Sequence, residues 1–175
     1  MAAEQEGRPA ESRRVKQPNS KNCFACGLDN PHGLALSFYE LGPDRLESRY
    51  SVPDRFEGYP GIVHGGVIAS MLDEIVSRTA MIGQHDEFMM TARLEIKYRQ
   101  PVPTHVELQL LGFLTRRKGR TATARGEVRL PDGTLGAEAE ATLVRMPGGP
   151  HDRDLLVSLG WRVRPDITGP AEEGA

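Results

Sequence analysis

The apolar positions divide the chain into segments of different period. Two short alternating runs, residues 34–39 and 45–52, flank the turn sequence Gly42-Pro43-Asp44 and predict a β-hairpin. Helical spacing follows over residues 66–82 and predicts one long helix with a broad apolar face. From Thr91 the period returns to two, which predicts four long strands. These strands cover residues 91–98, 106–110, 122–130 and 137–143.

A helix this apolar has to be covered on most of its sides. The most economical cover is a strongly curved antiparallel sheet wrapped around the helix, so the sequence predicts an α+β fold. Alanine and glycine recur on one face of the last two strands and leave room for a close neighbour. This neighbour is either the helix of the same chain or the sheet of a second copy, and the sequence favours both equally.

The two ends of the chain differ from its middle. Residues 1–21 are rich in charged residues, proline and glutamine, and predict a disordered tail. The run Pro147-Gly148-Gly149-Pro150 interrupts any regular element, and the apolar cluster behind it predicts a short helix followed by a loose end. We therefore expect one domain over residues 22–146, followed by an extension over residues 147–175.

Composition narrows the classes of function. A net charge of −2 and a pI near 6.2 argue against a nucleic-acid partner, because general nucleic-acid binders are basic. No apolar run approaches the roughly 18 residues of a membrane span, and the first residues lack the apolar region of a signal peptide. Cys23 and Cys26 are too few for a disulfide scaffold. We therefore expect a cytoplasmic protein without a membrane partner.

The sequence His64-Gly65-Gly66 leads directly into the predicted helix. Because glycine has no side chain, Gly65 and Gly66 leave the first N–H groups of the helix open at its positive end. An oxyanion can bind at such a place. A tight entry into the helix requires the same glycines, so both interpretations remain open.

Two carboxylates stand side by side in the predicted helix. Glu74 precedes Arg78 by four residues, an orientation that predicts an exposed ion pair. Asp73 has no such partner and borders small apolar residues, where an unpaired carboxylate is costly unless it is hydrogen-bonded or functional. Asp73 is therefore a candidate general base or nucleophile, and a capped or solvated aspartate is the alternative.

Four cations gather at a predicted hairpin tip in this acidic protein. They lie in the run Arg116-Arg117-Lys118-Gly119-Arg120. Such a run is usually a solvated tip, and the alternative is a rim that binds phosphate groups.

A larger pattern connects these features. An acid, Asp73, follows the histidine of residues 64–66 by nine positions, and residues 91–101 read Thr-x-x-Leu-x-Ile-x-Tyr-x-x-Pro. This combination resembles the PaaI-type hotdog thioesterases, and most of all the branch that contains the mammalian mitochondrial acyl-CoA thioesterases. Residues 23–34 also resemble the entry sequence of many of these proteins. The resemblance extends over residues 23–146.

The resemblance implies the hotdog fold, in which a curved antiparallel sheet surrounds a central helix, and a homodimer or homotetramer with active sites at the dimer interface. The N–H groups of Gly65 and Gly66 in one copy would polarise the thioester carbonyl, and His64 would position the site. The other copy would supply Asp73 and Thr91. Asp73 would attack the carbonyl or activate the water that does, and Thr91 would orient that water or Asp73.

The implied reaction is hydrolysis of an acyl-CoA substrate to free acid and CoA, with no metal and no other cofactor. Residues 116–120 would hold the phosphates of coenzyme A. The alternatives are a hotdog hydratase or dehydratase and a non-catalytic acyl-CoA-binding module. One departure is Gly58, which stands where some family members place Asn or Gln to assist the oxyanion.

The pair Cys23-x-x-Cys26 suggests zinc, with His32 as a third ligand. A single Cys-x-x-Cys pair is weak evidence for such a site. We therefore expect the two cysteines to pack or to brace the loop instead.

Overall fold

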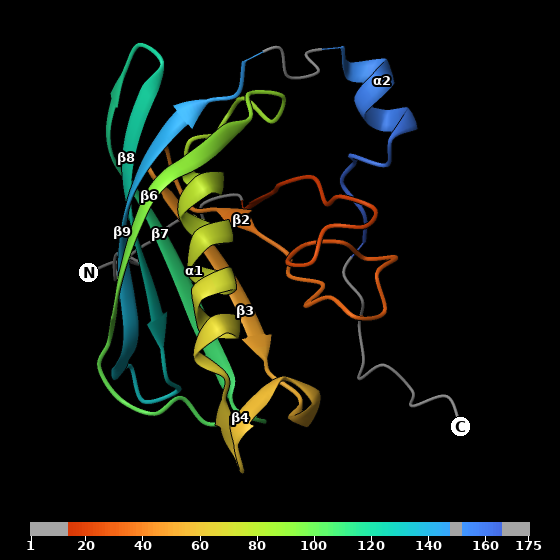
Figure 1. Cartoon of the computed structure of the whole chain (residues 1–175). Coiled ribbons are helices and arrows are strands. Elements are labelled where there is room, and N and C mark those ends of the chain that lie inside the picture. Colours follow the sequence, from red (N-terminus) through yellow and green to blue (C-terminus); the bar gives the residue numbers. More distant parts are fainter. Residues whose placement is uncertain (1–13, 148–151, 166–175) are drawn as a thin grey trace, which may run out of the picture.

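A single long helix, α1 (Gly65–Thr79), lies across one face of a seven-stranded sheet (Figure 1). The structure is a computed structural model and describes residues 14–147 and 152–165. The helix begins one residue before the predicted range of 66–82 and ends at Thr79, three residues short of its predicted end. Its apolar residues recur at helical spacing and are buried: Val67, Ile68, Met71, Leu72, Ile75 and Val76.

All strand pairs of the sheet are antiparallel, in the order β1-β2-β3-β7-β8-β9-β6. The α+β fold and the four long strands are thereby confirmed. The strands are β1 (Val15–Lys16), β2 (Tyr39–Glu40), β3 (Arg45–Ser51), β6 (Met89–Tyr98), β7 (Glu107–Lys118), β8 (Thr121–Arg129) and β9 (Leu135–Arg145). Among the described residues, β6 pairs only with β9, so the other edge of this long strand is unpaired.

The first strand of the predicted hairpin is shorter than the alternation suggests. Only Tyr39–Glu40 pairs with β3. The preceding residues instead bond to residues 20–33, the entry loop. The N–H of Leu34 donates to the carbonyl of Phe24, and the N–H of Leu36 donates to that of Ala25. Their alternation therefore reflects burial between this loop and the helix layer, because an extended segment has a period of two whichever neighbour it bonds to.

The small residues of the last two strands pack against α1. A Cβ atom on Gly126 would lie 2.9 Å from Cγ1 of Val76, closer than real Cβ contacts. The alanines that share this face are buried within one chain: Ala122, Ala124, Ala137, Ala139 and Ala141. The helix, and not a second copy, is therefore the close neighbour that these residues accommodate.

Residues 15–19 are placed differently from the tail predicted over residues 1–21. Val15–Lys16 forms β1, and the side chains of Gln17 and Asn19 are 0% and 1% exposed. Asn19 Nδ2 donates to the carbonyls of Cys26 and Leu36 at 3.0 and 2.8 Å. These polar residues are buried because their amides satisfy backbone carbonyls, which hydrophobicity patterns do not detect. Residues 1–13 lie outside the described part of the chain.

The C-terminal extension packs beside the entry loop. It contains α2 (Arg153–Ser158), of which Leu156 is buried (Figure 1). Trp161 Nε1 then donates to the carbonyl of His85 at 2.8 Å. The loose end expected after this helix lies partly outside the described residues.

Candidate active site

Two small elements position the N-terminus of α1: a 3₁₀ turn, η1 (Asp54–Phe56), and a two-stranded sheet of β4 (Glu57–Tyr59) and β5 (Ile62–Val63). These elements are too short to show a hydrophobic period in the sequence. The N–H of His64 donates to the carbonyl of Phe56 at 3.0 Å. His64 Nδ1 caps the helix by accepting a hydrogen bond from the N–H of Gly66 at 2.9 Å. One of the two predicted oxyanion donors is therefore engaged by the neighbouring imidazole.

Gly65 is the donor that this arrangement leaves open. Its N–H has no hydrogen-bond partner among the residues of 14–147 and 152–165, and it lies at the positive end of α1. The hydroxyl of Tyr98 donates to the Gly65 carbonyl at 2.9 Å, which joins the end of β6 to the start of α1. Tyr98 has no predicted role, although its place in the strand pattern of residues 91–101 is a signal for one.

Asp73 lies in the middle of α1, half-buried. Its carboxylate has no hydrogen bond or ion pair with any residue that the structure describes, as the absence of a partner in the sequence predicts. Gly66 and Asp73 are seven residues apart, which places them on one face of the helix about 10 Å apart along its axis. A single carbonyl group is too small to meet both Gly66 and Asp73 of the same copy.

Thr91 lies near the start of β6, half-buried and paired with Leu143 of β9. The register between β6 and β9 shifts between Thr91 and Arg93. Such an irregularity changes the direction in which side chains point. Within one copy, Thr91 and Asp73 make no hydrogen bond with each other, so the described chain does not itself join the proposed acid and hydroxyl.

The four cations of the hairpin do not form one rim. Arg117 makes an ion pair with Glu87, and its Nη1 donates to the carbonyl of Ala80 at 2.8 Å. Arg116 and Lys118 instead line a shallow hollow of about 230 Å³ on β7 and β8. Strand alternation explains this division, because neighbouring residues point to opposite faces.

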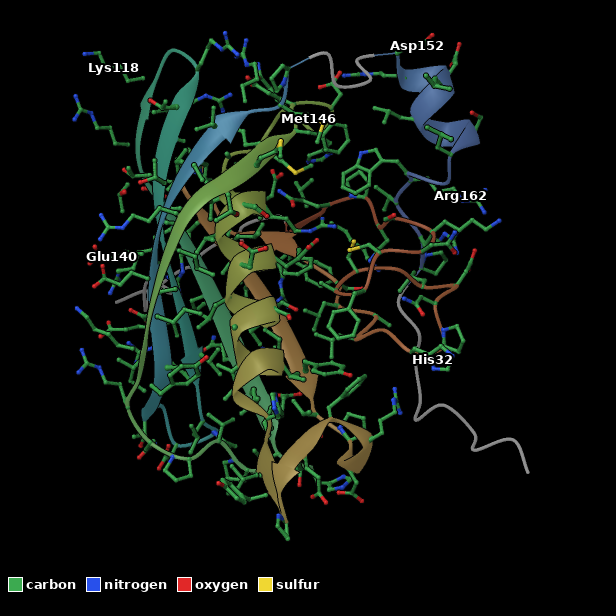
Figure 2. All side chains as sticks on the ribbon, viewed as in Figure 1. His32, Lys118, Glu140, Met146, Asp152 and Arg162 are labelled. Atoms are coloured by element: carbon green, nitrogen blue, oxygen red, sulfur yellow. The ribbon has the colours of Figure 1, made fainter. Side chains whose placement is uncertain are left out.

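The turn of this hairpin has the geometry that its sequence predicts. Gly119 has a φ of 56°, in the left-handed region that favours glycine, and Arg120 beside it is exposed. The outer face of the sheet holds a larger hollow of about 420 Å³, lined by residues of β6 to β9 that include Arg93, Arg125 and Glu140. Figure 2 shows Glu140 on the side of the sheet away from α1, so this hollow is separate from the helix entry.

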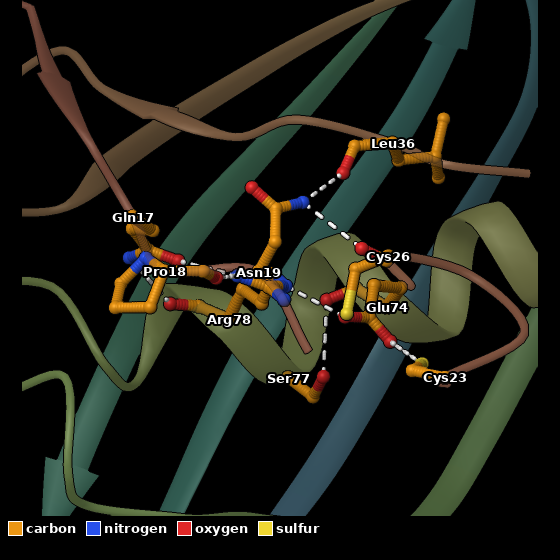
Figure 3. A network of polar contacts seen from close by, with 9 residues as sticks. All are labelled: Gln17, Pro18, Asn19, Cys23, Cys26, Leu36, Glu74, Ser77 and Arg78. Atoms are coloured by element: carbon orange, nitrogen blue, oxygen red, sulfur yellow. Dashed lines mark hydrogen bonds and ion pairs between the residues drawn. The ribbon is translucent and has the colours of Figure 1, made fainter. Parts of the chain in front are cut away.

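Glu74 and Arg78 form the predicted ion pair, but the prediction that it is exposed is wrong. Arg78 Nε donates to Glu74 Oε1 at 2.6 Å, and the Arg78 side chain is 2% exposed. Segments distant in the sequence cover it: the guanidinium donates to the carbonyl of Pro18 at 2.9 Å (Figure 3). It also lies over the rings of Phe38 and Trp161. Helix spacing predicts the pair, whereas its burial depends on segments distant in sequence.

The entry loop brings Cys23 and Cys26 to Glu74, and the three potential ligand atoms lie within 4.8 Å of one another. His32, the third ligand that the spacing suggested, is exposed and lies in a turn where its N–H donates to the side chain of Asn30. Figure 3 shows both cysteines beside Glu74. The structure therefore replaces His32 by Glu74 in this cluster.

The two thiols differ in acidity. A hydrogen bond from the Cys26 thiol lowers the pKa of Cys23 to about 6, helped by the N–H groups of Cys26 and Ala25, while burial and the charge of Glu74 act in the opposite direction. The same thiol hydrogen bond, burial and Glu74 raise the pKa of Cys26. Cys23 is thus the thiol that ionises first, and it is also the less buried of the two.

Comparison with known proteins shows a similarity to thioesterases. The sequence model of the thioesterase superfamily matches residues 60–137, from the small sheet before α1 to the start of β9. Acyl-coenzyme A thioesterase THEM4 of Rattus norvegicus is 27% identical over 136 residues, which cover 77% of this chain and 58% of that protein. A crystal structure of a thioesterase superfamily protein is 28% identical, with a TM-score of 0.62, and covers 69% of this chain and 58% of that one.

Residues 60–137 of the chain are thus similar to the thioesterase superfamily. The chain's curved antiparallel sheet around one long helix is the hotdog fold, as the resemblance implies. The same fold occurs in a Streptococcus mutans protein bound to acetyl CoA, which is 17% identical with a TM-score of 0.59 and covers 66% of this chain and 91% of that one.

The chain spans less than two thirds of the length of the THEM4 relatives that it matches. Over residues 14–147 and 152–165, no helix is long and apolar enough to cross a membrane.

Proposed function

We propose that the protein hydrolyses acyl-CoA thioesters to a free acid and CoA, in sites that two copies of the chain share. The observation that carries the proposal is the relation between Gly66 and Asp73, which lie on one helix face about 10 Å apart. In a two-fold dimer the same surface of each copy meets its counterpart, so the N-terminus of one helix can lie opposite the middle of the other. The unpaired edge of β6 offers a surface for such a dimer.

The chemistry follows from the groups that meet there. The N–H of Gly65, and that of Gly66 once the His64 side chain turns away, donate to the thioester oxygen and stabilise the negative charge that develops on it. Asp73 of the second copy takes a proton from the attacking water, or attacks the carbonyl carbon itself. Thr91 orients that water or the Asp73 carboxylate. The C–S bond then breaks, and the CoA thiolate leaves and takes up the proton that Asp73 removed from the water. Where Asp73 itself attacks, the thiolate takes a proton from solvent, and water then hydrolyses the acyl–Asp73 anhydride to the free acid and restores the carboxylate.

Acyl-CoA is supported as the substrate by the THEM4 relatives, which are named acyl-coenzyme A thioesterases. The exposed cations Arg116, Lys118 and Arg120 are the groups of the basic hairpin that remain available to the phosphates of CoA. We further propose that the protein acts in the cytoplasm and belongs to the PaaI-type branch.

The direct test is thiol release from short, medium, long and aryl acyl-CoAs. We expect Asp73→Asn to lower kcat by about 10²- to 10⁴-fold, the usual contribution of a general base, without loss of substrate binding. Asp154→Asn, which removes an exposed carboxylate at the start of α2, is the matched control and should retain full activity. Full thiol release by Asp73→Asn would overturn the role of Asp73. Tight binding of acyl-CoA without thiol release by the wild type would instead indicate a binding module.

A further inference from the structure

The turn from Cys23 to Gly27 is closed unusually tightly. The N–H of Gly27 donates to the carbonyl of Cys23 at 2.9 Å. A Cβ atom on Gly27 would lie 2.4 Å from that carbonyl oxygen and 2.6 Å from the Cys23 nitrogen, so no other residue fits. This tight turn holds the sulfur atoms of Cys23 and Cys26 within 4.8 Å of each other.

The helix presents a third ligand to these sulfurs. Glu74 Oε2 lies 3.9 Å from Cys23 Sγ, and the three ligand atoms are within 4.8 Å of one another. A tetrahedral zinc ion with bonds of about 2.3 Å to sulfur and about 2.0 Å to oxygen separates its ligand atoms by about 3.5–3.8 Å. Small side-chain movements of Cys23, Cys26 and Glu74 therefore suffice to close the cluster around an ion.

A hydrogen bond from Arg78 fixes the orientation of the Glu74 carboxylate. Its Oε1 accepts the hydrogen bond from Arg78 Nε at 2.6 Å, which leaves Oε2 directed at the cysteines. Arg78 is itself held by the carbonyl of Pro18 and by two aromatic rings. Carboxylates that bind metals are commonly hydrogen-bonded in this way, and the supporting contacts strengthen metal binding.

The charges balance when an ion is present. Two thiolates and one carboxylate carry three negative charges, which a divalent cation and the guanidinium of Arg78 neutralise. Nη2 of Arg78 is buried without a hydrogen-bond partner among the described residues, and Arg78 interacts with Cys26. A metal-bound Cys26 is deprotonated, so it would place a negative charge beside this guanidinium. Buried charges are stable only when they are paired in this manner.

We propose that Cys23, Cys26 and Glu74 bind a zinc ion that fastens the entry loop to α1, with water as the fourth ligand. Thiolate ligands favour zinc over magnesium or calcium. Cys23 is half-exposed, which gives the ion a path into the site. The three protein ligands come from two segments distant in the sequence, so the ion acts as a crosslink between them. This role is independent of the proposed hydrolysis.

The test measures metal directly, on untagged full-length protein purified under reducing conditions. We expect one zinc ion per chain by elemental analysis, and a thiolate-to-cobalt charge-transfer band when Co²⁺ replaces zinc in chelator-treated protein. Zinc should also raise the melting temperature of the chelator-treated chain. Cys23→Ser and Cys26→Ser should lose the cobalt band or weaken it severely. Glu74→Gln should keep the band but bind zinc at least 10-fold more weakly.

His32→Ala is the matched control, because His32 is a potential ligand in the same loop that the structure places outside the cluster. It should bind zinc as the wild type does. The proposal is overturned if wild-type protein with two free, reduced thiols shows neither zinc nor a cobalt band. Isolation of the chain as a metal-free Cys23–Cys26 disulfide, unable to bind cobalt after reduction, would overturn it in favour of a redox pair.

Discussion

His64 Nδ1 accepts the hydrogen bond of the Gly66 N–H at the start of α1, at 2.9 Å. The imidazole therefore serves as the helix cap, a place more often taken by Ser, Thr, Asp or Asn. The same N–H is a proposed oxyanion donor. The thioester oxygen of the substrate and the His64 imidazole therefore compete for the Gly66 N–H. Without substrate, the imidazole occupies this donor and stabilises the helix end, because it belongs to the same chain.

The capping role predicts the stability of His64 variants. His64→Ala should lower the free energy of unfolding by about 1 kcal/mol, because the Gly66 N–H loses its acceptor. His64→Asn should remain close to the wild type, since asparagine is among the best capping residues. Urea denaturation of the three proteins measures the difference. Equal destabilisation by both substitutions would show that His64 stabilises the helix entry by packing alone.

Sharing of the site between copies predicts complementation. Gly66→Ala and Asp73→Asn should each be nearly inactive alone. A heterodimer of the two retains one intact site, with Gly66 from the Asp73→Asn copy and Asp73 from the Gly66→Ala copy, so mixing after dissociation and reassociation should restore thiol release. A 1:1 mixture should reach about a quarter of wild-type activity, because half of the dimers are mixed and each has one intact site. A mixture that stays inactive would show that both residues serve a site within one chain.

The contact between Gly126 and α1 predicts a rescue. Gly126→Ala should destabilise the protein by about 1–3 kcal/mol, because the new Cβ overlaps Cγ1 of Val76. All atoms that this Cβ meets belong to side chains, so the same substitution should cost less in a Val76→Ala background. Thermal unfolding of the four proteins of this double-mutant cycle measures the coupling.

Gly112 is the contrasting case for that cycle. A Cβ there would meet Cγ2 of Thr79 at 2.8 Å but also the backbone carbonyl of Ile75 at 2.9 Å. Thr79→Ala should therefore fail to rescue Gly112→Ala, because a helix backbone moves less readily than a side chain. Rescue at both positions would indicate that the whole helix shifts.

The division of the basic hairpin predicts two separable phenotypes. Replacing Arg116 and Lys118 together by Gln should raise KM for acyl-CoA without lowering the melting temperature, and should leave a short pantetheine thioester unaffected. Arg117→Gln should instead lower the melting temperature, because it breaks the contacts with Glu87 and the Ala80 carbonyl. An equal effect of the double variant on both substrates would contradict a phosphate-binding role.

Burial of Tyr50 predicts an alkaline effect on stability. Burial raises the pKa of Tyr50 above its ordinary value of 10.0, and the charge of Arg55 offsets part of this effect. Because the folded chain holds the proton more tightly than the unfolded chain, this contribution to stability is complete below pH 10 and is lost as the pH rises through the folded pKa. When the ionisation of the tyrosines is followed by ultraviolet absorbance, Tyr50→Phe should remove a component that titrates above the ordinary pKa of tyrosine. An unchanged titration curve would contradict the assignment.

Most of the architecture could be predicted from the sequence because its elements are long. The helix and the four long strands each repeat their period several times, so local patterning identifies them. η1 and β1, β2, β4 and β5 have two or three residues each, which is too few for a period. Residues 15–19 are misjudged for another reason: Gln17 and Asn19 are polar, and only the folded chain shows the carbonyls that their amides satisfy.

The residues of the candidate site could be predicted from the sequence, but the contacts between them could not. The glycines at residues 65–66 and the acid at Asp73 follow from sequence, because glycine and an unpaired carboxylate are unusual in a helix. The engagement of Gly66 by His64, the hydrogen bond from Tyr98 and the replacement of His32 by Glu74 depend on the relative placement of distant segments. Sequence spacing contains no direct information on such placement.

The burial of Arg78 has a consequence for the order in which the protein matures during synthesis. Its guanidinium is enclosed by Gln17 and Pro18 near the start of the described chain and by Trp161 near its end. On the ribosome the helix is complete long before Trp161 emerges, so until then this charge remains partly open to water. The domain therefore reaches its final stability only after Trp161 has emerged, and a chain released before that point would keep its helix and sheet while exposing the guanidinium of Arg78.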